Sequence, residues 1–125
     1  MNLGIVGSQE FTDKILAFKI IDQIIEKIGE PEFIVSGRAK GADTVAEDYA
    51  RARELNTMIF PARWKKYGKS AGHRRNPIIV KHSDEIIAFW DYLSPGTKGT
   101  IELAANAGKK VYVVNIKDGS IAEIN

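Results

Sequence analysis

Short apolar runs alternate along the chain with longer segments in which apolar residues recur at helical spacing. The apolar runs predict five strands, at residues 3–6, 33–35, 57–60, 85–90 and 110–115. Helical spacing predicts helices between them, at residues 13–28, 42–50, 77–80 and 99–107. We expect the tail, residues 118–125, to add a short edge strand or to stay loose.

Capping and breaking residues predict where these helices begin and end. Thr12 or Asp13 suits the N-cap of the first helix, and the glycine and proline at residues 29 and 31 end it. Pro77 is expected near the first turn of its helix, because proline lacks the amide that an interior position needs. Gly108 closes the helix before the last predicted strand.

Strands and helices that alternate in this way predict a parallel sheet covered by helices on both faces. We therefore expect a Rossmann-like three-layer α/β/α sandwich with a mostly parallel sheet of about five strands. A length of 125 residues suits one such domain over residues 1–125. Sheets of this kind bind ligands in a crevice at the carboxyl ends of their strands, so the loops that follow the strands are the candidate site.

Three of these loops are rich in glycine and hydroxyl groups. Gly7 and Ser8 follow the first strand, the SGRAKGAD segment (residues 36–43) follows the second, and SPGTKGTIE (residues 94–102) follows the fourth. Glycines let backbone amides approach a phosphate, and a helix N-terminus favours negative charge. In the second loop the side chain of Asp43 fits a helix N-cap better than a ligand contact.

The residues that we expect to contact a ligand come from these loops and from the segment before the fourth strand. They are Gly7, Ser8, Ser36, Gly37, Arg38, Lys40, Gly41, Asp43, Trp64, Arg75, Asn76, Ser94, Gly96, Thr97, Gly99 and Thr100. The cations of the second loop would offset phosphate charge, with exposed amides at Gly99 and Thr100 as a second anion site. Arg75 would add a bidentate guanidinium, and Asn76 an amide for a ribose hydroxyl or a base edge. Trp64 or Tyr67 would supply an apolar wall.

The charge distribution changes the picture more than the net charge of +2 does. No acidic residue lies between residues 55 and 83, a segment that also holds both histidines. This block predicts an anion site, and the alternative is a solvated face balanced by acids elsewhere in the fold. Its cations are Arg63, Lys65, Lys66, Lys69, Arg74, Arg75 and Lys81.

Composition excludes several classes of protein. The chain has no cysteine, which excludes disulfides, thiolate metal sites and a cysteine nucleophile and, with no leader pattern at Met1, favours the cytoplasm. The apolar runs are too short to span a membrane, and the two histidines lack metal-ligand spacing, so no metal is expected. Neither a Walker A loop nor a GxGxxG fingerprint is present, and we expect no bound cofactor beyond a nucleotide-type ligand.

Four blocks in this order resemble the SLOG superfamily, and most closely its small branch related to YspA and cpYpsA. The blocks are GSQEF (7–11), SGRAKGAD (36–43), ARWKKYGKSAGHRRN (62–76) and SPGTKGT (94–100). The resemblance implies a pocket for a nucleotide or a nucleotide-derived ligand, such as a nucleoside phosphate, ADP-ribose or NAD. It also implies a protein that often self-associates, acting as a sensor or as an N-glycosidic hydrolase.

A related family, the cytokinin-activating phosphoribohydrolases, is similar in its PGGxGTxxE motif. Pro95, Gly96, Gly99 and Thr100 match that motif, and Arg75 matches the arginine on the preceding helix. This resemblance makes Glu102 and Arg75 the catalytic candidates. However, Glu102 lies one residue before the motif carboxylate, where the chain has Leu103, and one residue on a helix turns a side chain by about 100°. Asp91 is a further candidate base, although an aspartate there also suits a turn.

The DNA-processing protein of natural transformation is similar in its SGxAxGxD pattern, which residues 36–43 match. That relative binds single-stranded DNA. Here the basic block with Trp64 and Tyr67 interleaved would supply phosphate contacts and stacking faces. In the small SLOG branch the same aromatic residues look like pocket wall and packing. We therefore expect a nucleotide pocket, with single-stranded nucleic-acid binding as the alternative.

Overall fold

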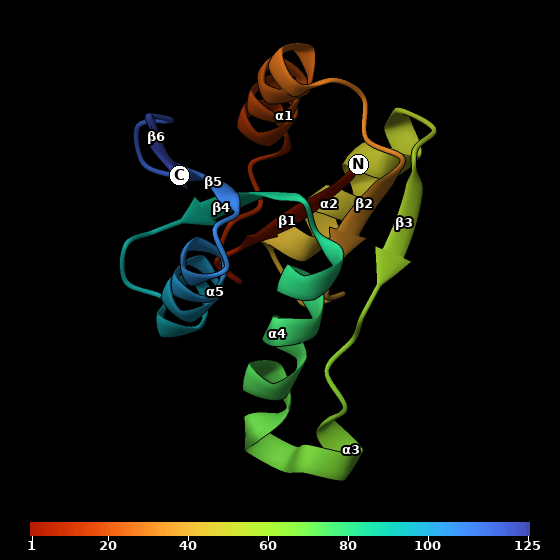
Figure 1. Cartoon of the computed structure of the whole chain (residues 1–125), viewed down its shortest axis with the longest axis vertical. Helices are drawn as coiled ribbons and strands as arrows, with labels where there is room; N and C mark the ends of the chain where they lie inside the picture. Colours follow the sequence, from red (N-terminus) through yellow and green to blue (C-terminus); the bar gives the residue numbers. More distant parts are fainter.

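The computed structural model describes all 125 residues, which form six strands and five α-helices (Figure 1). In chain order the elements are β1 (Asn2–Gly7), α1 (Lys14–Ile28), β2 (Phe33–Ser36), α2 (Ala42–Ala52), β3 (Asn56–Ile59), α3 (Trp64–Tyr67), the 3-10 turn η1 (Gly68–Ser70), α4 (Ala71–His82), β4 (Glu85–Trp90), α5 (Pro95–Asn106), β5 (Lys110–Asn115) and β6 (Ile121–Ile124).

The strands form one sheet in the order β3-β2-β1-β4-β5-β6. The first five are parallel, and β6 pairs antiparallel with β5, so the tail forms an edge strand. The chain builds outward from β1 to β3 and then returns to place β4 on the other side of β1. The predicted Rossmann-like, mostly parallel architecture is confirmed, and its topological switch point lies between β1 and β4.

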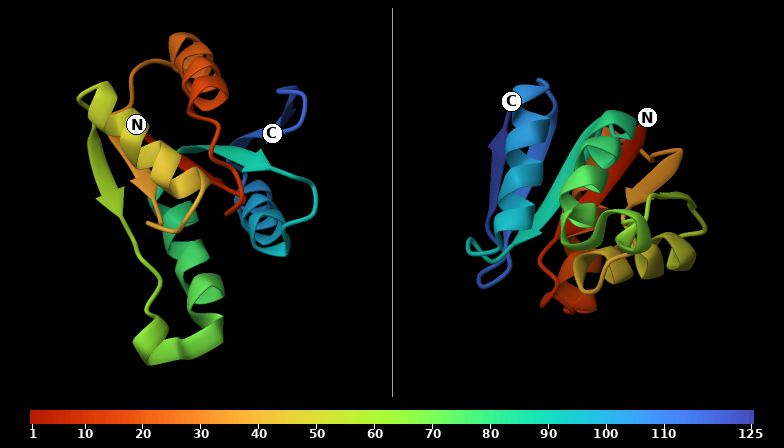
Figure 2. Two further views of the ribbon diagram at one scale, coloured as in Figure 1. Left: turned by 180° about the vertical axis from the view of Figure 1, so that it is seen from behind. Right: turned by 90° about the horizontal axis from the view of Figure 1, so that it is seen from below.

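Helices cover both faces of the sheet, and alternate strand residues supply the two cores. On one face α1 and α2 pack against a core that includes Ile5, Ile87 and Phe89. On the other face α4 and α5 pack against a core that includes Ile86 and Ala88. Figure 2 shows this three-layer arrangement from two further sides. Buried strand side chains that are apolar on both faces explain why the strands read as continuous apolar runs.

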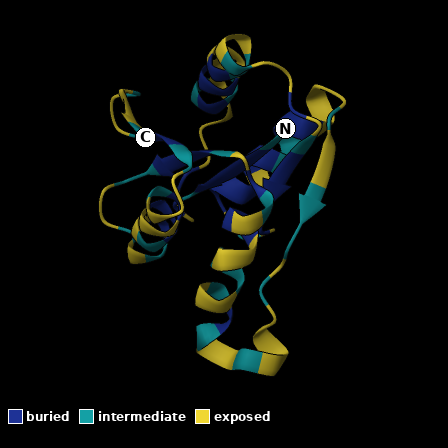
Figure 3. Cartoon of the chain, viewed as in Figure 1, coloured by how far each residue is buried: buried dark blue, intermediate teal, exposed yellow.

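Residues 63–76, which we call the arm, extend beyond the carboxyl edge of the sheet (Figure 1). The arm comprises α3, η1 and the first half of α4. Most of its residues are exposed or half-buried, in contrast to the sheet (Figure 3). This part of the chain is therefore held by few core contacts and presents its side chains to solvent.

The structure corrects two predicted helix starts. Helix α4 begins at Ala71, so Pro77 lies inside it rather than near its first turn. Pro77 has no amide to donate to the carbonyl of His73, but both residues are exposed and water can hydrate that carbonyl. Helix α5 begins at Pro95, four residues before the predicted start, because Pro95 occupies its first position, where a missing amide costs nothing.

Candidate ligand-binding site

A cavity of about 620 Å³ opens at the switch point of the sheet. We call it the crevice. Loops after β1, β2 and β4, the N-terminus of α5 and one side of the arm line it. Most of the predicted contact residues lie along it: Gly7, Ser8, Gly37, Arg38, Asp43, Trp64, Arg75, Asn76, Ser94, Gly96, Thr97 and Thr100. The three loops and the basic segment are therefore brought together, as parallel topology requires.

The other predicted residues lie outside the lining of the crevice. Ser36 and Gly41 are buried behind the second loop, and Lys40 is exposed. Gly99 lies in the second turn of α5, because this helix begins earlier than predicted. Glu102 is exposed on the same helix and does not line the crevice, so the acids that do are Glu10 and Asp43.

Arg75 connects the second loop to the segment that follows β3. Its Nη1 donates to the carbonyl oxygens of Gly37 at 2.6 Å and of Phe60 at 3.2 Å, and its Nε donates to Oδ1 of Asn76 at 3.1 Å. The guanidinium lies so close to Gly37 that a Cβ there would collide with Nη1 and Cζ of Arg75. Any larger residue at position 37 would therefore displace the guanidinium from its present place. Nη2 makes no hydrogen bond within the chain and remains available to a ligand.

Asp43 lies beside this arginine at the start of α2 but does not cap the helix, contrary to our expectation. The N-cap is Gly41, and the Asp43 carboxylate accepts from the backbone amide of Ala39 at 3.1 Å. Burial raises the pKa of Asp43 to about 6, and the amide hydrogen bonds and the charge of Arg75 only partly oppose this effect. Burial lowers the pKa of Arg75, and the Asp43 carboxylate acts in the opposite direction. The base of the crevice thus holds a buried carboxyl group near the half-buried guanidinium of Arg75.

A hydroxyl network joins the loops after β1 and β4. Ser8, which is 1% exposed, accepts from the backbone amide of Asp91 at 3.2 Å and from the hydroxyl of Ser94 at 3.2 Å. Asp91 in turn accepts from the amides of Ser94 and Leu93 at 2.7 and 2.8 Å. These hydrogen bonds, that of the Ser94 amide first, hold the pKa of Asp91 below its usual value. Asp91 therefore organises the turn and does not line the crevice as a base would.

Several hydrogen-bond donors that line the crevice have no partner within the chain. They are the backbone amides of Gln9, Glu10, Gly96 and Thr97, together with the hydroxyl of Thr97. The Asn76 side chain accepts through Oδ1, which leaves its amide NH₂ free to donate. Free amides at the N-terminus of a helix, with a cation nearby, are the donors that bind phosphate in proteins. The hydroxyl of Thr100, in contrast, donates to the carbonyl oxygen of Gly96 at 3.2 Å.

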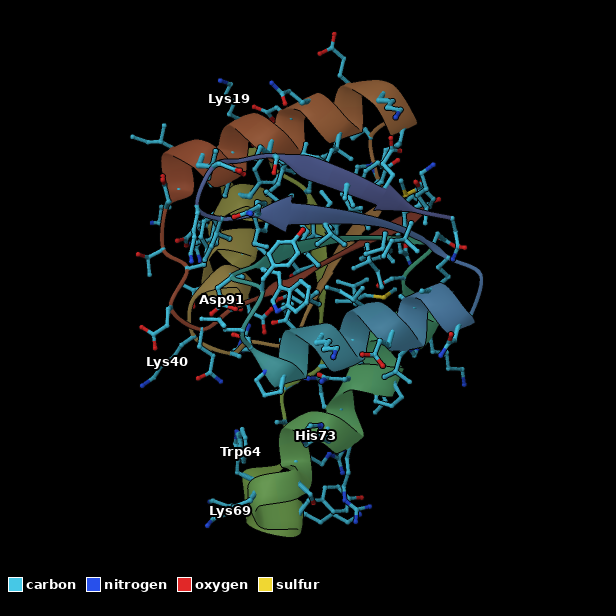
Figure 4. All side chains as sticks on the ribbon, turned by 90° about the vertical axis from the view of Figure 1, so that its left-hand side faces the viewer. Lys19, Lys40, Trp64, Lys69, His73 and Asp91 are labelled. Atoms are coloured by element: carbon cyan, nitrogen blue, oxygen red, sulfur yellow. The ribbon has the colours of Figure 1, made fainter.

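None of the cations of the arm takes part in an ion pair. The seven ion pairs of the structure involve other residues, such as Arg38, which pairs with Glu47 at 3.3 Å. Trp64 is 59% exposed and lines the crevice with Lys69 and His73. Figure 4 shows Trp64 and Lys69 projecting from the arm on the side where Lys40 lies. The arm therefore presents cations that have no direct acidic partner.

Sequence reasoning missed part of the crevice. Gln9 and Glu10 line it through the loop after β1, and Lys69, Gly72 and His73 line it from the arm. The free amides of the first loop follow from a backbone conformation that no side chain signals. Residues 72, 73, 76 and 79 of α4 share one helix face and all line the crevice. The sequence did not predict this grouping because Pro77 indicated that the helix begins later.

No three histidine, aspartate or glutamate side chains are grouped so that they could hold a metal ion. None of the helices combines the length and the apolar character needed to cross a membrane.

Comparison with known proteins identifies the family. The model of the YspA, cpYpsA-related SLOG family matches residues 2–67, just over half of the 125-residue chain. The chain belongs to this SLOG family. The match runs from β1 to the end of α3 and so includes the loops after β1 and β2. Arg75, Asn76 and the start of α5 lie beyond it, so their place in the crevice of this SLOG protein is a finding of the structure.

Two solved structures share the fold of this SLOG protein at 22% sequence identity. DNA processing protein A from Streptococcus pneumoniae aligns with a TM-score of 0.68 over 94% of this chain and 53% of its own. DNA processing protein A from Helicobacter pylori, which binds single-stranded DNA, aligns with a TM-score of 0.65 over 91% and 65%. The chain therefore spans less than two thirds of each. No curated protein matches the sequence.

Proposed function

We propose that this SLOG protein binds a phosphate-bearing nucleotide or nucleotide-derived ligand in the crevice. The observation that supports this most strongly is the convergence of unpartnered donors on one cavity: the amides of Gln9, Glu10, Gly96 and Thr97 and the hydroxyl of Thr97. A volume of about 620 Å³ is in the range of small-molecule pockets. Membership of a SLOG family agrees with such a ligand.

The donors assign parts of the ligand to parts of the crevice. Phosphate oxygens would accept from Gly96 and Thr97 at the start of α5 and from Nη2 of Arg75, in place of the predicted Gly99 and Thr100 amides. The free amide of Asn76 would donate to a ribose hydroxyl or to a base edge. Trp64, exposed at the rim, would form an apolar wall.

The test is a thermal-shift screen with AMP, ADP-ribose and NAD. We expect one class to raise the melting temperature, and we expect Thr97→Val to weaken its binding by about tenfold because a hydrogen bond to charged phosphate is lost. The Thr97 hydroxyl makes no hydrogen bond within the chain, so this variant should leave the fold intact. Arg75→Ala should abolish the shift, and Lys81→Ala, at an exposed position away from the crevice, should not change it. A screen with no shift, or equal shifts in all variants, would refute the proposal.

N-glycosidic hydrolysis is a narrower form of this proposal and needs a carboxylate at the sugar. Glu102 lies outside the lining of the crevice, whereas Glu10 lines it and is exposed. If the protein hydrolyses AMP to adenine, Glu10→Gln should abolish release of the base and Glu102→Gln should not. Release that depends on Glu102 would contradict this assignment.

A second candidate function is binding of single-stranded nucleic acid along the arm. Its support is the unpaired positive charge of the arm beside the exposed ring of Trp64, in a fold shared with a protein that binds single-stranded DNA. Fluorescence anisotropy with a labelled oligothymidylate distinguishes the two functions. Binding along the arm should weaken steeply with salt and with Trp64→Ala. Absence of binding at low salt would exclude it.

Self-association and a cytoplasmic location stay predictions. Sedimentation velocity of the purified chain tests the first, and fractionation of cells that express it tests the second.

A further inference from the structure

A second cavity, of about 590 Å³, adjoins the arm on the side away from the crevice. We call it the lateral groove. Its wall on α4 consists of Ala71, Arg74, Arg75 and Ile78, which share one helix face by their spacing. The crevice uses residues 72, 73, 76 and 79 of the same helix, so the two cavities lie on different faces of α4. Arg75 is at the boundary and, with Pro61 and Ala62 of the preceding segment, lines both.

The lateral groove combines an apolar wall with arginines and contains no acid. Ile78, 43% exposed, faces the same cavity as Phe60 and Tyr67. Arg63, Arg74 and Arg75 line it, and none of the three forms an ion pair. Arg74 lies over the ring of Tyr67, 4.6 Å from its centroid, and its Nε donates to Ser70.

We infer that the lateral groove binds a small amphipathic carboxylate, a molecule with a flat apolar body and one anionic head. The apolar body would displace water from Phe60 and Ile78, and the carboxylate would accept from a guanidinium of Arg63 or Arg74. The absence of acidic lining excludes cations, and the arginines favour an anion over a neutral apolar molecule.

Arg75 connects the two cavities through its hydrogen bonds. The carbonyl of Phe60, in the wall of the lateral groove, and the carbonyl of Gly37, in the wall of the crevice, accept from the same Nη1. A carboxylate held by Arg63 or Arg74 also attracts the third arginine of the groove, Arg75, and a shift of its guanidinium toward the lateral groove lengthens its hydrogen bond to Gly37. The hydrogen bonds of Arg75 thus couple the two cavities, as an effector site and its target would be coupled.

The binding test uses 1-naphthoate as the probe and 1-naphthylmethanol as its neutral control. In ¹H–¹⁵N spectra of the full chain, naphthoate should shift the amides of Tyr67, Arg74 and Ile78, and the alcohol should bind about tenfold more weakly because it lacks the charge. Ile78→Glu should abolish the shifts by adding negative charge and Arg74→Gln should weaken binding, with exposed Lys81→Gln unchanged. No shift, equal binding of both probes or shifts confined to the crevice would overturn the inference.

The coupling is read in the same spectra and needs no nucleotide. Naphthoate should also shift the amides of residues 37–39, which the probe does not touch. Binding to the lateral groove without these shifts would overturn the coupling. Because the probe is not a nucleotide, failure of the nucleotide proposal would leave this result interpretable, and the reverse holds as well.

Discussion

Replacing Asp43 with asparagine should remove a pH dependence of stability that its buried carboxyl creates. Burial raises the pKa of Asp43 from 3.8 to about 6, and the side chain is 6% exposed. Between these two pH values the unfolded chain releases the proton while the folded chain keeps it. Stability of the wild-type protein therefore falls as the pH rises through this window, by about 3 kcal/mol in total at 1.36 kcal/mol per pKa unit.

The assay is urea unfolding at closely spaced pH values. We expect the free energy of unfolding of Asp43→Asn, relative to wild type, to rise by about 3 kcal/mol between about pH 3 and pH 7. The matched control is Asp22→Asn. A hydrogen bond from Arg53 lowers the pKa of Asp22, so its stabilisation is present at neutral pH and is lost in acid, and this variant should show the opposite slope.

A stability difference between Asp43→Asn and wild type that stays constant with pH would refute the reasoning. It would mean that the Asp43 carboxyl titrates at the same pH in the folded and unfolded chain, so that burial is fully compensated by the amides and by Arg75. Direct titration of the carboxyl carbon by ¹³C NMR would give the same answer independently of unfolding.

Two further substitutions test packing. Gly37→Ala should destabilise the protein by about 1–3 kcal/mol in urea unfolding, because its Cβ collides with the Arg75 guanidinium; Gly99→Ala, where a Cβ meets nothing within 4 Å, should instead stabilise α5 by up to about 1 kcal/mol. A Gly37→Ala variant as stable as the wild type would contradict the close approach of Arg75. Pro77→Ala should raise stability by about 1–3 kcal/mol, since proline inside α4 removes a helix hydrogen bond; a lower melting temperature in this variant would mean that Pro77 has a packing role.

The parts of the fold that sequence predicted well are those that a single physical rule determines. The strands at 85–90 and 110–115 have the observed bounds because burial on both faces leaves uninterrupted apolar runs. Asp13 was one of two predicted caps, and its carboxylate accepts from the amide of Leu16 at 3.1 Å. The position of the crevice at the carboxyl ends of the strands followed from parallel topology alone.

The parts that could not be predicted depend on tertiary context. A proline predicts a helix start, yet Pro77 lies in the interior of α4 because the exposed first half of this helix tolerates an unpaired carbonyl. Helix α3 has only four residues, too few to show periodicity. Asp43 occupies a position in the sequence that suits a helix cap. In the structure its carboxylate instead accepts from the amide of Ala39 and lies near Arg75, which is 32 residues away in the sequence. Residue types alone do not reveal such long-range pairings.

Because the cations of the arm form no ion pairs, ionic strength should affect the stability of the arm and of helices α1 and α2 in opposite directions. Like charges on the arm repel one another, and salt at physiological concentration screens such repulsion beyond about 8 Å. The ion pairs of α1 and α2, such as that of Arg53 with Asp22, are weakened by the same screening. Added salt should therefore slow hydrogen exchange in α3 and α4 and hasten it in α1 and α2. The same change of solution stabilises one end of the protein and destabilises the other.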